Sequence, residues 1–314
     1  MLLPKARGDL SQTLFDALRQ GGDQISGVRG INPTDHDDAQ IGLWAMYELH
    51  YSGFEDVDDM MEWHPGVLEL RNDLETEFEH TLRRRHRVTP SEAPFAEHFF
   101  AFVEAHDGAS LATHVQRHAD RDEVLELLRH RTIYHLKESD PVAWVVPRLP
   151  TVPKAALMEL QFDEYGGGDP NRLHGHLFAL GLDASGLRSD YGAYIDDVPV
   201  ETLEENNAMS LFGLHRRLRA AALGHLAAFE ATSSLPSRRM AQGLARLGFP
   251  AEIVAYYAEH VEADAVHEQL AVRTICGSLV EAEPQLVDDV MFGAFTCLDL
   301  ADRYARRMLE QWAA

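Results

Sequence analysis

The sequence contains little cysteine, and Cys276 and Cys297 do not stand in a paired spacing. A disulfide framework or a thiolate zinc site needs several closely spaced cysteines, so the sequence disfavours both. Long apolar runs are also missing. No segment approaches the roughly 20 apolar residues of a membrane span, and residues 1–20 lack the apolar core of a signal peptide. We therefore expect a soluble, reduced, cytoplasmic protein.

Basic residues are scarce as well. The chain has 28 lysines and arginines against 51 acids, a formal charge of −23. Such a surface repels phosphate backbones and anionic membranes. The composition therefore predicts no nucleic-acid partner and no membrane partner.

Strand signals are weak, and the apolar run at 142–149 is broken by Pro147. Amphipathic patterns instead predict an all-α protein. The expected helices cover residues 38–53, 64–86, 92–106, 121–139, 151–164, 171–182, 200–231, 236–247, 250–276 and 284–312. We expect the acidic stretch 35–38 to be a solvated loop and helix start. The interruption EAHDGAS suggests a boundary near residue 105, between a helical N-terminal region at 1–105 and a core at 106–314.

The most informative residues are four acids and three histidines that could bind metal. They are Glu138, Glu164, His174, Glu230, His260, Asp264 and His267. Four carboxylates balance the charge of two Fe²⁺ ions, which would let the cluster be buried. The densest part has the spacing i, i+4 and i+7 from position 260, which places three side chains on one helix face.

The isolated candidates depend on their local context. Glu230 follows Leu226 and Leu223 by one and two turns, so it should project from an apolar face and need a partner such as a metal or an arginine. Spacing alone is weak evidence for Glu138 and Glu164. The side chains of His174 and His176 diverge on a helix, so at most one of them is expected to face the site.

Four motifs in series resemble those of the haem-oxygenase-like family of diiron oxidases and oxygenases. They are KESDPVAWVVPRL, DEYGGGDPNRLHGHLF, LHRRLRAAALGHLAAFEATSS and HVEADAVHE. The resemblance is strongest over residues 125–280 and is nearest to the central N-oxygenase domain of the streptozotocin biosynthetic enzyme. Matched by motif, the family's ligands fall on all seven candidates.

The resemblance implies a haem-oxygenase-like helical bundle with an N-terminal helical extension, which could form a homodimer. It implies two Fe(II) ions, O₂ as cosubstrate, an external reductant where needed, and a peroxo-bridged diferric intermediate. Its implied substrate is a small amino acid or amino-acid derivative of specialised metabolism. N-oxygenation is slightly favoured over C–H activation that leads to desaturation, cyclisation or C–C cleavage. No haem is expected, because haem would leave the four carboxylates without a purpose.

The roles of four other residues near these motifs are left open by the sequence. Tyr134 and Tyr256 lie one turn before Glu138 and His260 and could line a substrate pocket or simply pack in the core. Arg148 and Arg172 could recognise a substrate carboxylate or form surface ion pairs.

Two other classes of protein are possible. The first is a noncatalytic metal-binding helical protein, in which the seven residues only bind metal. The second is a hydrolase on the same architecture with a cysteine nucleophile. That reading is weak, because Cys276 is nine residues beyond His267, on the opposite helix face.

Overall fold

The computed structural model describes residues 1–28 and 30–314, except for the side chains of residues 22, 23, 26 and 262–266. Its described elements are all helical, which confirms the all-α prediction. The α-helices are Asp9–Gln20 (α1), His36–Glu48 (α2), Pro65–Arg85 (α3), Phe95–Glu104 (α4), Leu111–Arg117 (α5), Arg121–His135 (α6), Asp140–Ala143 (α7), Thr151–Glu164 (α8), His174–Ala184 (α9), Val200–Leu214 (α10), Arg219–Arg246 (α11), Ala251–Gln269 (α12), Gly277–Ala282 (α13) and Val287–Ala313 (α14). Short 3₁₀ segments are Gly22–Gly27 (η1), Asp59–Trp63 (η2), Val146–Arg148 (η3), Gly166–Gly168 (η4), Pro170–Arg172 (η5), Arg216–Leu218 (η6) and Pro284–Leu286 (η8), and a π-helix covers Leu270–Cys276 (η7).

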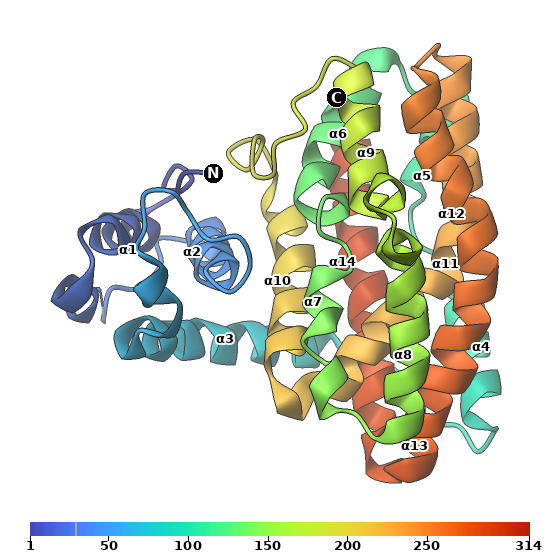
Figure 1. Cartoon of the computed structure of the whole chain (residues 1–314), viewed down its shortest axis with the longest axis horizontal. Helices are drawn as coiled ribbons and strands as arrows, with labels where there is room; N and C mark the ends of the chain where they lie inside the picture. The colour runs from blue at the N-terminus through green and yellow to red at the C-terminus, as the bar shows by residue number, and fades with distance from the viewer. Residues whose placement is uncertain (29) are drawn as a thin grey trace.

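The long helices form a bundle beside a smaller group of N-terminal helices. In Figure 1, α1 and α2 lie to one side, α3 runs across toward the bundle, and α10 forms the near edge of the bundle. Within the bundle, α11 packs against both α12 and α14, while α12 also packs against α9. Among the described residues, no helix combines the length and the apolar character needed to cross a membrane.

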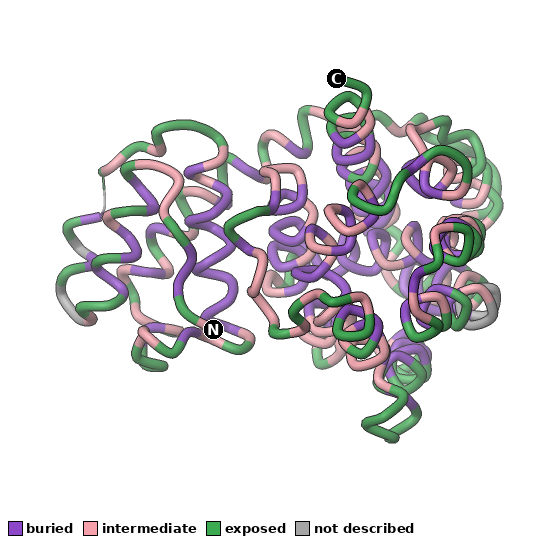
Figure 2. The backbone as a smooth tube through the Cα atoms, turned by 90° about the horizontal axis from the view of Figure 1, so that it is seen from above, coloured by how far each residue is buried: buried purple, intermediate pink, exposed green. Residues whose placement is uncertain are grey.

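The hydrophobic core is continuous between the N-terminal helices and the bundle. One cluster of buried apolar side chains includes Leu14 and Trp44 together with Leu211, Leu223 and Phe292. A second cluster fills the end of the bundle where α5, α6, α12 and α14 meet. Figure 2 shows buried backbone in both halves of the molecule. The proposed division at residue 105 stays a prediction.

Two glycines allow α11 and α14 to lie unusually close together. A Cβ added at Gly224 would lie 1.9 Å from the Val290 carbonyl oxygen, and one added at Gly293 would lie 1.9 Å from that of Ala221. Any side chain at these positions would push the two backbones apart. This close crossing fixes the position of the helix that carries Glu230.

The expected helices at 200–231 and 236–247 are divided differently in the structure. The first breaks at His215, where the backbone is extended, and Arg148 donates to the Gly213 and Leu214 carbonyl oxygens at 2.5 and 2.9 Å. These bonds satisfy the open C-terminal carbonyls of α10. α11 then continues through Pro236, because its packing on α12 and α14 outweighs the intrinsic cost of an internal proline.

The expected helix at 250–276 extends further than predicted. α12 is followed directly by the π-helix η7 and by α13, which ends at Ala282. A π-helix adds one residue per turn and rotates the side chains that follow it. The change of register begins just after His267.

The acidic stretch at 35–38 begins a helix as expected, but it is not fully solvated. Asp35 caps α2 by accepting from the Asp38 backbone N–H at 3.0 Å. The buried Asp38 carboxylate accepts backbone N–H groups of Leu10 and Ser11 in α1 and of Thr34, at 3.1, 2.8 and 2.9 Å. It therefore joins the N-termini of two helices.

Candidate metal centre

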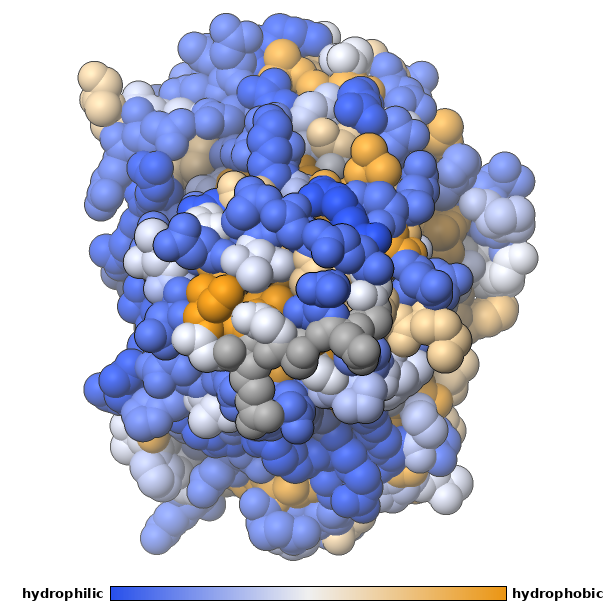
Figure 3. Space-filling model, turned by 90° about the vertical axis from the view of Figure 1, so that its left-hand side faces the viewer, coloured by the Kyte–Doolittle hydropathy of each residue, from blue (hydrophilic) through white to orange (hydrophobic). Residues whose placement is uncertain are grey.

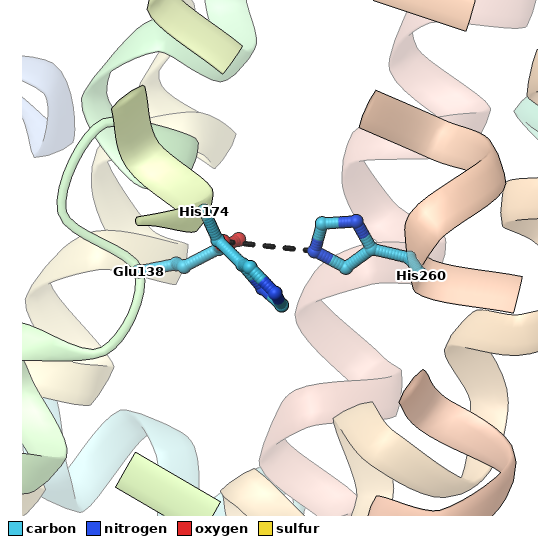
Figure 4. A group of neighbouring side chains, drawn as sticks. All are labelled: Glu138, His174 and His260. Atoms are coloured by element: carbon cyan, nitrogen blue, oxygen red, sulfur yellow. Dashed lines mark ion pairs between the residues drawn. The ribbon is translucent and has the colours of Figure 1, made fainter. Parts of the chain in front are cut away.

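One group of three side chains gathers Glu138, His174 and His260. Glu138 lies in the turn after α6, His174 begins α9, and His260 is on α12, so three separate segments contribute (Figure 4). One potential ligand atom from each lies within 4.8 Å of the others. Glu138 Oε1 is 3.6 Å from His260 Nε2 and 3.8 Å from His174 Nδ1.

The hydrogen bonds of His260 define which of its nitrogens can bind a cation. His260 Nδ1 lies 2.8 Å from the Tyr256 carbonyl oxygen, and a carbonyl can only accept, so Nδ1 carries a proton. In the neutral ring Nε2 then presents a lone pair toward Glu138 Oε1. Two lone pairs facing each other repel unless a proton or a cation lies between them.

The second oxygen of Glu138 is held from the opposite side. Glu138 Oε2 is 3.1 Å from His135 Nδ1 and accepts from the Tyr256 hydroxyl at 3.3 Å. Tyr256 and His135 also contact each other at 2.7 Å. These groups orient the carboxylate so that Oε1 points to the two histidines, as outer partners of a metal ligand do.

A second group of three gathers Glu164 from α8, Glu230 from α11 and His267 from α12. His267 Nδ1 is 3.3 Å from Glu164 Oε1 and 3.6 Å from Glu230 Oε2. The other ring nitrogen, Nε2, lies 3.4 Å from Asp163 Oδ2. Asp163 therefore holds the ring with Nδ1 turned toward the two glutamates.

The two groups are adjacent. His174 Nδ1 of the first group is 3.0 Å from Glu164 Oε2 of the second. The same Glu164 oxygen accepts from the Ser139 hydroxyl at 3.2 Å. A carboxylate in this position can contact ligands of both groups, as a bridging ligand would.

The arrangement fits buried cations. Glu138 Oε1, His174 Nδ1 and His267 Nδ1 are buried and have no hydrogen bond of acceptable geometry within the described part of the chain. Buried polar atoms are normally satisfied, so atoms that converge without hydrogen bonds indicate a missing partner. Carboxylates and imidazoles are ligands that iron accepts.

The pKa shifts of the site residues also fit bound cations. Burial by itself would raise the pKa of Glu138, but His135 and His260 hold it well below its usual range. Burial would lower the pKa of His267, whereas Glu164 and Glu230 raise it to about 11. A proton on His267 therefore balances the charge of the neighbouring carboxylates, and a bound metal ion would replace that proton.

The structure brings together six of the seven predicted ligands, in two groups of three. The side chain of the seventh, Asp264, lies outside the described residues. Tyr256 contacts Glu138 directly, and Tyr134 is buried against His135 and Phe229. Whether either tyrosine touches a substrate stays a prediction.

Arg148 and Arg172, the two candidates for binding a substrate carboxylate, contact other parts of the protein. Arg148 caps α10, as described above. Arg172 is 69% exposed in its side chain and lies 3.8 Å from Glu259. Neither is among the residues that line the described cavities next to Glu138.

Sequence reasoning missed His135, Ser139 and Asp163. His135 and Ser139 flank Glu138 by three positions and one, and Asp163 directly precedes Glu164. Their proximity to the ligand motifs was a signal, because residues beside a ligand often orient it. Their actual partners depend on how the helices pack.

The structure does not support the hypothesis of a hydrolase with a cysteine nucleophile. Cys276 is buried and its thiol donates to the Leu223 carbonyl oxygen at 3.4 Å. Burial raises the pKa of this thiol far above neutrality, so it stays protonated, whereas a nucleophile needs the thiolate.

A helical bundle with two adjacent groups of carboxylates and imidazoles is the arrangement expected of an all-α metal-binding protein. A family model described as iron-containing redox enzyme matches residues 125–302. The match covers more than half of the chain, and the protein therefore belongs to this family of haem-oxygenase-like fold. Its membership indicates iron and an oxidoreductase activity.

Solved structures show the same fold. A CADD-like protein of unknown function from Nostoc punctiforme aligns with a TM-score of 0.53 and 15% sequence identity, over 75% of this chain and 98% of the other. At this identity the likeness concerns the fold alone. No curated protein matches the sequence.

Proposed function

We propose that the protein is a nonhaem diiron oxygenase or oxidase that uses O₂ to oxidise a small amino acid or an amino-acid derivative. The observation that carries this proposal is the pair of adjacent groups Glu138–His174–His260 and Glu164–Glu230–His267. Each group offers carboxylate and imidazole atoms to one ion, and Asp264 would be the seventh ligand. The family description as an iron-containing redox enzyme supports iron as the metal.

The favoured reaction is N-oxygenation, as in the streptozotocin N-oxygenase branch. When an amine becomes a hydroxylamine, one oxygen atom enters the N–H bond and the other leaves as water. This stoichiometry needs two electrons and two protons from an external reductant. Bound iron would supply O₂ activation, while the residues of this chain hold the ions and orient the substrate.

The alternative reaction is C–H oxidation, with desaturation as the simplest case. The substrate then loses two electrons and two protons, and a reductant supplies two more of each to convert O₂ to two waters. Both reactions use the same metal centre. Product analysis by mass distinguishes them, since N-oxygenation adds one oxygen atom that comes from O₂ and can be isotopically labelled, whereas desaturation removes two hydrogen atoms and adds no oxygen.

The first test is an anaerobic Fe²⁺ titration followed by mixing with O₂, with and without a panel of amino acids. We expect about two irons per chain and O₂ consumption that depends on the amino acid. Glu230→Ala should abolish the consumption while most secondary structure remains. A matched control is His130→Gln, which changes a buried histidine that bonds Tyr304 outside both groups.

Three other outcomes would distinguish the proposal from its alternatives. Rapid iron uptake without amino-acid-dependent O₂ consumption would favour the noncatalytic metal-binding protein. Full activity of Glu230→Ala would remove this residue from the centre. Absence of iron binding in the unmodified protein would contradict the proposal.

A further inference from the structure

A large cavity, partly open to solvent, lies beside the candidate metal centre but includes none of its six described residues. It has a volume of about 340 Å³ and lies between α5, α6, α10, α11 and α14. Its walls are largely apolar, with Phe229, Met240 and Leu298 among them. A volume of this size suits a small organic molecule.

Two opposite charges face this cavity. Arg131 on α6 and Glu205 on α10 both line it, with Arg131 Nη1 3.5 Å from Glu205 Oε2. Their side chains remain 24% and 12% accessible, respectively. Within the described part of the chain, Arg131 donates no hydrogen bond and Glu205 accepts none.

This pair is incomplete as a purely structural ion pair. The Arg131 guanidinium also lies 5.0 Å from the centre of the Tyr304 ring, but its five N–H donors and the two acceptor oxygens of Glu205 meet in a single contact of 3.5 Å. Burying such charges without hydrogen bonds is costly. A ligand that carries both charges on neighbouring atoms would satisfy both partners together.

The surroundings of Arg131 and Glu205 shift the pKa values of both groups. Burial would lower the pKa of Arg131, but Glu205 outweighs this effect and raises it, so the guanidinium stays charged. Burial raises the pKa of Glu205, with Arg131 opposing the change. An ammonium group beside Glu205 would favour its charged form further.

A second cavity adjoins both the large cavity and Glu138 of the candidate metal centre. It has a volume of about 30 Å³, is lined by Glu138 and shares Tyr134, Met209, His225 and Phe229 with the larger one. Burial lowers the pKa of His225 to about 4, so this shared histidine is neutral. Arg131 and His135 are one helical turn apart, about 6 Å along the axis, and His135 contacts Glu138.

We propose that Arg131 and Glu205 form the headgroup site for an α-amino acid, with Arg131 binding the carboxylate and Glu205 the ammonium. The side chain of the amino acid then extends along the apolar wall toward Tyr134 and Glu138. This inference depends on the proposed function in one respect, because it takes Glu138 to be part of the reacting centre. The headgroup site itself is a binding site and can be tested without iron.

The test is calorimetric titration of the protein with the twenty common L-amino acids, in metal-free buffer and again with anaerobic Fe²⁺. The tightest binder is then compared with the amine that lacks its carboxylate and the acid that lacks its amine. We expect each truncated analogue to bind at least about tenfold more weakly, because it leaves one buried charge without a partner.

Variants assign the two roles. Arg131→Lys keeps the charge but loses the planar fork, and should weaken amino-acid binding about tenfold. Glu205→Gln should reduce discrimination against the analogue that lacks the amine. Because removing one charge alone can destabilise the fold, Arg131→Met/Glu205→Leu is included, with circular dichroism to verify folding. Arg129→Met, on the same helix but outside the cavity lining, is the control.

The outcomes separate this inference from the proposed function. Unchanged amino-acid affinity in folded Arg131→Lys and in the double variant would overturn the headgroup site, as would the absence of binding by any amino acid. Amino-acid binding that depends on Arg131, in a protein that binds no iron, would support the headgroup site and contradict the diiron proposal.

Discussion

At the residue scale, the two groups of candidate ligands differ in their partners. The His260 ring is oriented by the carbonyl of Tyr256, whereas the His267 ring is oriented by the carboxylate of Asp163. Each histidine belongs to a different group. The two positions should therefore affect different metal ions.

We predict that His260→Ala and His267→Ala each bind about one iron per chain where the unmodified protein binds about two, because each removes one ligand from one group. Iron counting after anaerobic loading and desalting measures this. Loss of both irons in each variant would mean that the two ions bind only together. Two irons in either variant would exclude that histidine as a ligand.

A second prediction concerns Tyr256. Tyr256→Phe removes a hydroxyl that contacts Glu138 Oε2 and His135, while the ring stays in the core. We expect about 10- to 100-fold weaker iron binding, because outer partners of metal ligands have effects of this size. Tyr257→Phe is a suitable control, since Tyr257 is buried next to Tyr256 without a hydrogen bond to Glu138 among the described contacts. Equal iron affinity in the two variants would contradict an orienting role.

At the scale of elements, Asp38 joins α1 to α2. Burial would raise the pKa of its carboxyl, but hydrogen bonds from Ser11, Thr34 and Leu10 lower it below the ordinary 3.8. The folded form thus binds this proton less readily than the unfolded chain. The stabilisation is complete above the unfolded pKa and is lost as the pH falls through the lowered folded pKa.

We predict that Asp38→Asn lowers the free energy of unfolding by about 2 kcal/mol at pH 7, because charged hydrogen bonds become neutral ones. The difference between the two proteins should shrink as the pH falls below about 4. Urea unfolding at pH 7 and at pH 3 measures this. A difference that does not change with pH would show that the carboxylate charge is not the source of the stabilisation.

At the scale of the whole molecule, a buried cluster connects the N-terminal helices to the candidate centre. Lys137, the neighbour of Glu138, pairs with Glu48 at the end of α2. The Tyr191 hydroxyl donates to Glu48 Oε2 at 3.0 Å, and the Lys137 ammonium lies 4.1 Å from the centre of the Tyr51 ring. The N-terminal region thereby holds the backbone next to a candidate ligand.

We predict that Lys137→Met lowers the free energy of unfolding by about 3–5 kcal/mol, because Glu48 would remain as an uncompensated buried charge. The double variant Lys137→Met/Glu48→Leu should recover most of the loss. Chemical denaturation of the single and double variants measures this coupling. Additive losses would contradict it.

The expected homodimer remains a prediction, to be tested by sedimentation equilibrium. Figure 3 shows the face on the side of the N-terminal helices, which is mostly hydrophilic with small separate apolar areas. A dimer formed through this face would therefore bury mainly polar side chains.

Helical periodicity by itself determined the all-α class, and the spacing of His260 and His267 placed both on one helix. These features depend on neighbours within two turns, which a sequence displays directly. The resemblance in four motifs named the other candidates before any contact was known. The break at His215 and the passage of α11 through Pro236 were not predicted, because packing between helices outweighs local preference there.

Only the tertiary structure divided the candidates into two groups and identified His135 and Asp163 as their partners. It also placed Arg131 opposite Glu205, although 74 positions separate them in the sequence. Which side chains meet across a bundle depends on the rotation and closeness of whole helices, such as the glycine contact between α11 and α14. No local pattern in the sequence contains that information, because it arises from all the packed side chains together.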